Sequence, residues 1–256
     1  GFGQAGPGNW EMVGWDGMHN TIHQCVHNAL EDAGLKIEQI AGAGFGCAGY
    51  DWSEDRAPIA KIIDDLGMQC SYGLVNDAMI GLIAGAKDGW GVVVIAGTGT
   101  NARGRDRKGH EGQMTGISSQ FGENGGATEI TQRAIQEVAM AWTRRRPETR
   151  LSELFLEVTG AEDVEDFLAG LARERYEVTE SIAPRIFQLA EAGDAVAEEI
   201  IHWAGEELGD MAVGIIRQLS FQDEAFEVVM AGSIFKGSKC LIDSMKTHVL
   251  NIAPKA

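Results

Sequence analysis

The sequence predicts an α/β fold of two lobes in which most strands run parallel. Strand patterns alternate with helical patterns along the 256 residues, which is typical of layered α/β proteins. A continuous apolar run at residues 91–96 is of the kind that forms buried strands. A long stretch from 151 to 219 has helical spacing. We therefore expect a first lobe over residues 1–88 and a second over 89–256, with a helical insert at about 150–220.

The first lobe opens with a predicted helix over residues 16–34. Ile22, Val26 and Ala29 recur at helical spacing, and Gly34 stands where a glycine commonly ends a helix. The elements expected after it are a strand over 40–48, a helix over 53–66 that ends at Gly67, a strand over 69–75 and an apolar helix over 78–86.

The second lobe contains the strongest predicted strand, 91–96, which runs into Gly97-Thr98-Gly99-Thr100 and a second strand over 101–107. The remaining elements expected are a glycine-rich loop over 112–126, a long helix over 127–146, helices over 151–219 with breaks near 160, 170–176 and 193, a buried strand over 226–231, and a last helix over 238–250.

The charge of the chain argues against some classes of partner. Lys and Arg number 21 against 38 Asp and Glu, a formal charge of −17, and such a balance repels nucleic acid and anionic membranes. ATP would then be held by backbone amides and a metal ion. The one basic run, residues 144–146, is expected to be a solvated helix end. No apolar stretch approaches the ~20 residues of a membrane helix, and the first ten residues lack a signal-peptide pattern.

The cysteines and histidines predict no metal centre. Cys25, Cys47, Cys70 and Cys240 show no CxxC spacing, so we expect small buried thiols in a reducing compartment and a cytoplasmic location. His19, His23 and His27 share one helix face without an acidic ligand at metal spacing, which favours a solvated or lobe-facing stripe.

The turn at residues 97–100 has two interpretations. The glycine patterns at residues 1–6, 44–49 and 97–102 do not combine the strand, tight turn and immediate helix of a dinucleotide site. Glycines and hydroxyls after a buried strand suit phosphate oxygens, because the backbone can approach closely and donate. A plain hairpin turn explains the same residues equally well.

Several polar residues near strand ends also allow two roles. Asp77 follows a strand, where an α/β fold places a general base, and it also begins an apolar helix as a cap would. Asn9 and Asp51 fit either a ligand contact or an ordinary turn. Lys236 could approach a nucleotide, although an exposed lysine at a helix start is the simpler interpretation. Trp10, Trp15 and Trp52 suit either a wall against a sugar ring or core packing.

Five segments resemble motifs of the N-acetylglucosamine kinase and BadF/BadG ATPase family. Residues 92–101, Val-Val-Val-Ile-Ala-Gly-Thr-Gly-Thr-Asn, resemble its second phosphate motif. Asn76-Asp77 resembles its strand-end aspartate, and Gly6-Pro7-Gly8-Asn9-Trp10 resembles the loop whose asparagine reaches the sugar. Residues 120–127 look like its Gly-Asp-Glu-Gly-Ser segment, with Glu123 where the family has Asp. Residues 229–235 resemble the strand-Gly-Ser turn that holds the adenosine.

The resemblance covers almost the whole chain and implies a two-lobed actin-like ATPase fold, of the ribonuclease H-like type, with an interlobe cleft. It implies ATP and Mg²⁺ as cofactors and phosphorylation of an amino sugar, with N-acetylglucosamine as the first candidate substrate. Asp77 is then the catalytic base, and the residues implied to contact the sugar are Asn9, Asp51, Asn76 and Glu123. The residues implied to bind the nucleotide are Gly97, Thr98, Gly99, Thr100, Asn101, Gly232 and Ser233.

The sequence also departs from the family's pattern. Members open with a hairpin whose Asp-Gly-Gly-x-Thr loop binds metal and phosphates, and this sequence begins downstream of it. The longer Glu123 side chain leaves the identity of the sugar open. Two other functions also stay open. One is an ATPase that drives a partner protein; related ATPases of this kind, the dehydratase activators, carry an iron–sulfur cluster bound by cysteines. The other is a non-catalytic sugar-binding regulatory module. A homodimer is a further possibility.

Overall fold

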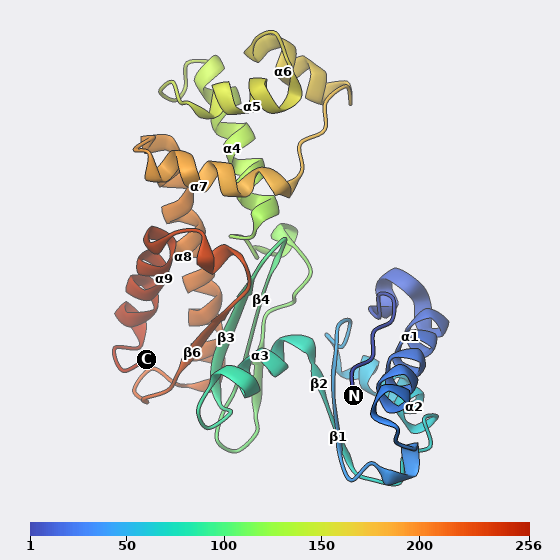
Figure 1. The fold of residues 1–256 in the computed structure, drawn as a ribbon. Helices are drawn as coiled ribbons and strands as arrows, with labels where there is room; N and C mark the ends of the chain where they lie inside the picture. Colours follow the sequence, from blue (N-terminus) through green and yellow to red (C-terminus); the bar gives the residue numbers. More distant parts are fainter. The chain divides into compact units, whose positions relative to one another are not determined.

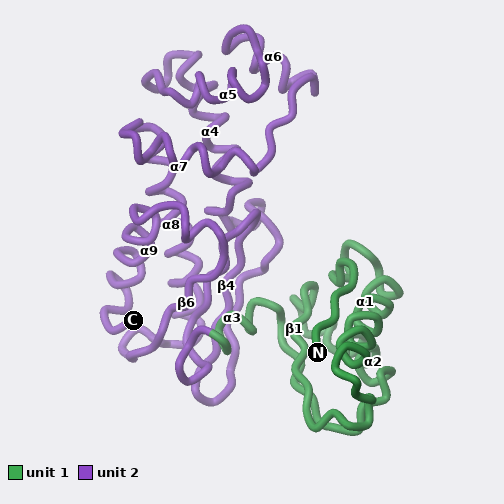
Figure 2. The backbone as a smooth tube through the Cα atoms, in the orientation of Figure 1, with its two compact units in different colours: residues 1–84 green, residues 85–256 purple.

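The computed structural model describes residues 1–256, which form two compact units, Gly1–Ala84 and Gly85–Ala256. Figure 2 colours the two units separately. The boundary predicted from the sequence lies after residue 88. No helix in either unit combines the length and apolar character needed to cross a membrane.

The first unit begins with helix α1, Trp10–Ala33. Asn9 caps its start, because its Oδ1 accepts a hydrogen bond from the Glu11 amide at 2.9 Å, and Gly34 ends it in the left-handed conformation. The predicted start at residue 16 is wrong. Gly14 has φ +71° and kinks the helix, so regular helical spacing is visible in the sequence only beyond it.

The sheet of the first unit has two parallel strands, β1 (Ala43–Cys47) and β2 (Tyr72–Asn76). Helix α2 (Arg56–Asp64) lies between them in sequence, and α3 (Asp77–Gly85) follows β2 directly. Short 3₁₀ turns precede β1 and α2 at Ile37–Gln39 and Ser53–Asp55. A small core of apolar residues joins α1, α2 and the strands, including Met18, Ile59, Ile63 and Leu74.

The sheet of the second unit has the strand order β5-β4-β3-β6. Its strands are β3 (Gly91–Ala96), β4 (Thr100–Arg105), β5 (Glu111–Gln113) and β6 (Val228–Ala231). Strand β3 pairs antiparallel with β4 and parallel with β6, and β4 pairs antiparallel with β5. Strand β3 lies where the sequence predicted it, and four of its residues, Val92, Val93, Val94 and Ala96, are fully buried.

Strand β5 corrects the prediction of a continuous loop over 112–126. It is a three-residue edge strand with only one buried residue, too short to show an alternating pattern. Glycine allows the sheet to meet a helix here: a Cβ at Gly104 would lie 2.4 Å from the Ile215 side chain. Close backbone approach therefore packs this edge against helix α8 (Ala195–Leu219).

The helices of the second unit form one continuous core with its sheet. They are α4 (Ala127–Trp142), α5 (Leu151–Thr159), α6 (Val164–Ala172), α7 (Ala183–Glu191), α8 and α9 (Lys239–Ile252), with 3₁₀ turns at Ser119–Phe121, Glu180–Ile182 and Ile234–Lys236. Figure 1 shows α8 and α9 beside the sheet, and α5 and α6 at the end of α4 that is remote from it.

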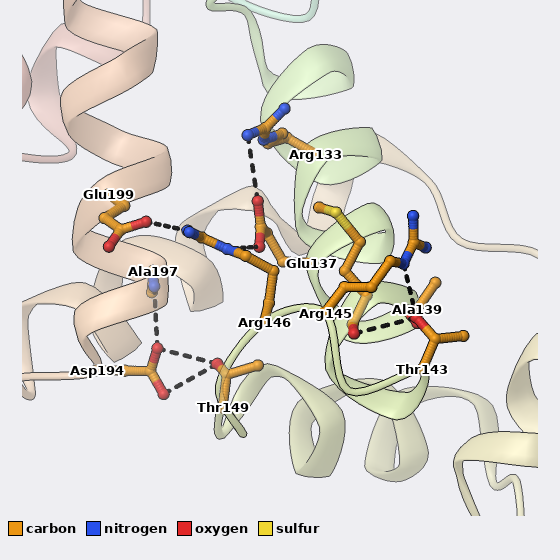
Figure 3. Close-up of polar contacts among 11 residues, drawn as sticks. Arg133, Glu137, Ala139, Thr143, Arg145, Arg146, Thr149, Asp194, Ala197 and Glu199 are labelled. Carbon is orange, nitrogen blue, oxygen red and sulfur yellow. Dashed lines mark hydrogen bonds and ion pairs between the residues drawn. The ribbon is translucent and has the colours of Figure 1, made fainter.

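The basic run at 144–146 is not simply a solvated helix end, as Figure 3 shows. Helix α4 stops at Trp142, and the chain turns through Arg144 at φ +60°. Arg146 thereby returns to α4, where its Nε lies 2.9 Å from the Glu137 carboxylate, and it also pairs with Glu199 of α8. Glu137 is almost fully buried and pairs with Arg133 as well. The prediction for Arg146 is wrong because a buried carboxylate requires such partners.

The cysteines are all free, but only Cys47 is buried. Cys25 and Cys70 are half-buried, and Cys240 is exposed, so the prediction of four buried thiols is correct for one. Of the three histidines on α1, His19 and His23 stack with ring centroids 4.0 Å apart, and His23 Nε2 lies 3.1 Å from the Ile62 carbonyl oxygen.

Candidate functional site

Polar side chains gather where β1 and β2 end in the first unit. The two strands are parallel and in register, so Cys47 at the end of β1 lies opposite Asn76 at the end of β2. The buried Asn76 amide donates to the Tyr50 carbonyl at 3.1 Å and to Asp51 Oδ1 at 3.2 Å. Its Oδ1 accepts from the Ala78 amide at 2.9 Å. Asn76 therefore joins the loop after β1 to the start of α3.

Asp77 is exposed at the first residue of α3. Its Oδ1 accepts a hydrogen bond from the Ala78 amide at 2.9 Å, so the capping role is present. Its Oδ2 makes no hydrogen bond within the protein and can accept one from a ligand. Burial of the Cys47 thiol, and then the negative charge of Asp77, raise the pKa of Cys47 to about 11.

Asn9 reaches the same loop from the start of α1. Gly49 has φ +79°, and a Cβ there would lie 2.4 Å from Asn9 Oδ1. The Trp10 indole N–H donates to the Gly49 carbonyl at 2.6 Å. The structure thus brings Asn9, Asp51, Asn76 and Asp77 to one edge of the first unit. We call these four residues the strand-end cluster.

The aromatic residues near the cluster divide into two groups. Trp10 and Trp15 stack on each other, with ring centroids 4.3 Å apart and planes 8° from parallel. Trp52 lies in the loop after β1 and is 42% exposed, so its ring is available to a ligand and does not pack in the core.

In the second unit the turn between β3 and β4 is fixed on the first residues of α4. The Gly97 and Thr98 carbonyls accept hydrogen bonds from the Ala127 and Thr128 amides at 2.9 and 3.0 Å. The Gly97 amide donates to the Gly99 carbonyl at 2.9 Å and is not available to a ligand. The Thr98 and Gly99 amides have no acceptor in the protein. The turn is a hairpin turn and also presents two free donors, so its two interpretations are compatible.

This turn forms one wall of a cavity of about 350 Å³. Gly232 brings the chain after β6 against the end of β3, since it has φ +112° and a Cβ there would lie 2.1 Å from the Ala96 carbonyl oxygen. The predicted residues Gly97, Thr98 and Ser233 line the cavity, whereas Gly99, Thr100 and Gly232 do not. The other lining residues are Ala127, Glu180, Ser181, Ala183, Pro184, Phe187, Ile234, Lys236 and Gly237.

The cavity suits a nucleotide. Its volume is within the usual range for small-molecule sites, and it combines apolar side chains such as Phe187 and Ile234 with a few polar groups. Lys236 places a cation at the cavity, and the free amides of Thr98 and Gly99 lie at the adjoining turn. Sequence reasoning missed the wall over 180–187, because these residues form no motif in a long helical stretch.

Two predicted residues lie away from this cavity. Asn101 is on β4, and its buried Oδ1 has no hydrogen-bond partner. Glu123 is 3% exposed, and its two oxygens accept hydrogen bonds from the Thr115 and Ile117 amides. Glu123 therefore holds the loop that precedes it, in addition to any contact with a ligand.

The residues are compatible with Mg²⁺ held on a nucleotide. No group of three or more His, Cys, Asp or Glu side chains is arranged to hold a metal ion. Mg²⁺ in phosphoryl-transfer sites is held mainly by phosphates and water, with only one or two protein carboxylates.

Sequence comparison identifies relatives along the whole chain. The profile of the BadF/BadG/BcrA/BcrD ATPase family matches residues 1–255. The N-acetylmuramic acid/N-acetylglucosamine kinase of Clostridium acetobutylicum is 25% identical over 253 residues, which are 98% of this chain and 82% of that protein. The N-acetyl-D-glucosamine kinase of Dictyostelium discoideum is 25% identical over 262 residues, covering 97% of this chain and 82% of that protein.

Solved structures share the fold. A candidate N-acetylglucosamine kinase from Chromobacterium violaceum has a TM-score of 0.61 at 20% identity, covering 96% of this chain and 88% of that one. The hexokinase of Schistosoma mansoni in complex with glucose has a TM-score of 0.51 at 15% identity, covering 91% and 69%. The predicted fold class, that of the actin-like ATPases and sugar kinases, is confirmed by this likeness.

Proposed function

The chain belongs to the BadF/BadG/BcrA/BcrD ATPase family, and we propose that it is an ATP-dependent kinase of an amino sugar. N-acetylglucosamine is the first candidate substrate. The strand-end cluster is the observation that carries this proposal. It combines a carboxylate oxygen free to accept a proton with amide and carboxylate groups suited to sugar hydroxyls. The names of the two curated relatives support the same substrate class.

Asp77 is the proposed general base. Its Oδ1 is held by the Ala78 amide, so the carboxylate is fixed while Oδ2 faces outward. Oδ2 accepts the proton of the acceptor hydroxyl as that oxygen bonds to the γ-phosphorus of ATP. The bond from the γ-phosphorus to the bridging oxygen breaks, and ADP leaves. Asn9 and Asp51 hold the neighbouring sugar hydroxyls, and Asn76 positions Asp51.

The nucleotide is assigned to the cavity beside the β3–β4 turn. The amides of Thr98 and Gly99 donate to phosphate oxygens, and glycine at position 99 allows the close approach. The adenosine lies against Phe187 and Ile234 near Ser233. Bound to the triphosphate, Mg²⁺ supplies charge neutralisation. A cytoplasmic location follows from the proposed use of ATP.

The test is ADP release from Mg·ATP with a panel of hexoses and N-acetylhexosamines. We expect release that depends on an N-acetylhexosamine. The substitution Asp77→Asn should lower kcat by about 10² to 10⁴-fold, the range for loss of a general base, while the sugar still binds. Asp65→Asn is the matched control, because Asp65 is also exposed in the first unit and lies at the end of α2 away from the cluster.

Other outcomes would favour the other functions. Release of ADP without any sugar, unchanged in Asp77→Asn, would indicate an ATPase that drives a partner protein. No release, with sugar binding still detectable by calorimetry, would indicate a sugar-binding regulatory module.

A further inference from the structure

Acidic side chains lie in the strand-end cluster and next to it in the chain. Glu11 contacts the cluster directly, with Asn9 Nδ2 3.5 Å from its Oε2. Asp55 is buried, and its Oδ2 accepts hydrogen bonds from the backbone amides of the loop that carries Asp51. We call the acidic residues at this edge the acidic rim; they are Glu11, Asp51, Glu54, Asp55 and Asp77.

Cations are scarce at this edge. Residues 1–84 contain eleven Asp and Glu against three Lys and Arg, a formal charge of −8. Lys36 precedes β1 at the end opposite the cluster, and Lys61 is exposed on α2. Arg56 is the one cation in the loop region, and it has partners within the protein, with its Nη1 3.5 Å from the Tyr50 hydroxyl.

We infer that the sugar site selects uncharged N-acetylhexosamines and rejects those that carry a carboxylate, such as a 3-O-lactyl substituent. This inference rests on the proposed function and narrows its substrate class. It separates this chain from the Clostridium acetobutylicum relative, whose name includes N-acetylmuramic acid as well as N-acetylglucosamine.

The physical reason is repulsion between like charges. A substrate carboxylate entering among the rim carboxylates meets no free cation of the first unit and loses part of its hydration. Juxtaposed like charges suppress the wrong partner strongly. A neutral sugar carries no charge to be repelled, and its hydroxyls donate hydrogen bonds to Asp51 and Asp77 of the strand-end cluster. We expect kcat/KM to be at least about tenfold lower for the acidic sugar.

Three acceptors separate charge from size: N-acetylglucosamine, N-acetylmuramic acid, and the methyl ester of N-acetylmuramic acid. The ester keeps the bulk of the lactyl group without its charge. We expect N-acetylglucosamine and the methyl ester to be phosphorylated and N-acetylmuramic acid to be a poor substrate. The discrimination against the acid should shrink when salt rises from about 0.05 to 1 M, because the screening length falls to about 3 Å.

Calorimetric binding of the same three sugars to the full chain is measured in parallel. If no sugar is phosphorylated but the two neutral sugars bind and the acid does not, the kinase proposal fails while the selectivity stands. If the ester is as poor as the acid, size is the cause and the inference is overturned. Equal use of the acid and N-acetylglucosamine, or binding of none of the three, overturns it as well.

Charge reversal on the rim gives a second test. Glu54→Lys should raise kcat/KM for N-acetylmuramic acid several-fold and leave N-acetylglucosamine unchanged, since Glu54 is exposed and outside the strand-end cluster. Glu38→Lys is the matched control, because it changes the net charge equally in the 3₁₀ turn before β1, remote from the strand ends. Equal responses to the two substitutions would show that only the total charge matters and would contradict a rim effect.

Discussion

The two oxygens of the Asp77 carboxylate have different surroundings, and this difference decides what the residue can do. Oδ1 accepts from the Ala78 amide, while Oδ2 is open. The sequence predicted both roles, cap and base, because each depends only on a strand followed by a helix. The bond from Asn76 to Asp51 joins residues 25 positions apart, so no local pattern could reveal it.

The Cys47 thiol should make stability depend on pH in the alkaline range. Its pKa is raised from 9.0 to about 11 by burial and by the Asp77 charge. Below pH 9 the thiol is neutral in both the folded and the unfolded chain, so its contribution to the free energy of unfolding is fully present. Between pH 9 and 11 the unfolded chain loses this proton while the folded chain keeps it. The free energy of unfolding should therefore fall with rising pH, by up to about 2 kcal/mol from this group.

Urea unfolding from pH 8 to pH 11 measures this effect. The slope of unfolding free energy against pH should be less negative in Cys47→Ala than in the original chain. Cys70→Ala is the control, because Cys70 is only half-buried. Identical slopes for Cys47→Ala and the original chain would contradict the proposed ionisation.

At the scale of elements, the cavity proposed to bind the nucleotide depends on two chain reversals. The β3–β4 turn is held by the first amides of α4, and the turn after β6 passes over the end of β3 at Gly232. Both reversals follow predicted strands, and the sequence located both. The two turns meet at one cavity because β3 pairs in parallel with β6, which lies more than 100 residues later in the chain. A local sequence pattern does not specify such a pairing.

Substituting Gly232 by Ala should disrupt the second reversal. A Cβ would lie 2.1 Å from the Ala96 carbonyl oxygen, at a φ of +112° that alanine rarely adopts. We expect a loss of about 2 to 4 kcal/mol in stability and weaker binding of ATP. Thermal unfolding and nucleotide titration would measure these effects. Gly42→Ala is the control, because a Cβ there meets nothing within 4 Å, and a similar loss in both variants would contradict the steric explanation.

The errors in predicting elements have local causes. Helix α1 was predicted to begin at residue 16 because Gly14 interrupts the helical backbone. Strand β5 was missed because three residues at a sheet edge carry too little pattern. In contrast, β3 was predicted at its observed bounds, since a fully buried strand leaves an uninterrupted apolar run.

At the scale of the whole molecule, the chain has two separate hydrophobic cores, one in each unit. The proposed sugar contacts, Asn9, Asp51 and Asp77, belong to the first unit, and the proposed nucleotide contacts belong to the second. Sequence motifs predicted both groups. They did not locate the wall formed by Glu180–Ile182 and α7, which comes from a helical segment whose only visible pattern is its apolar face.

Ligands should therefore protect different segments from amide hydrogen exchange. A non-hydrolysable ATP analogue should slow exchange at residues 97–99, 180–187 and 232–237, which form or adjoin the cavity. N-acetylglucosamine should slow exchange at residues 9–10, 49–52 and 76–78. Mass spectrometry of the full chain measures both effects. If the nucleotide analogue protected residues 49–52 and left the cavity residues unchanged, the assignment of the two ligands would be wrong.

The stacked pair of Trp10 and Trp15 has a spectroscopic consequence. Two parallel indoles at 4.3 Å couple their electronic transitions, so their near-ultraviolet circular dichroism depends on the angle between the rings. Trp10 is also bonded to the Gly49 carbonyl, in the loop that carries Asp51. A shift of that loop when a sugar binds should turn one ring against the other, because Trp10 is bonded to the loop. The stacked pair is thus an optical reporter of the proposed sugar site, readable without an attached dye.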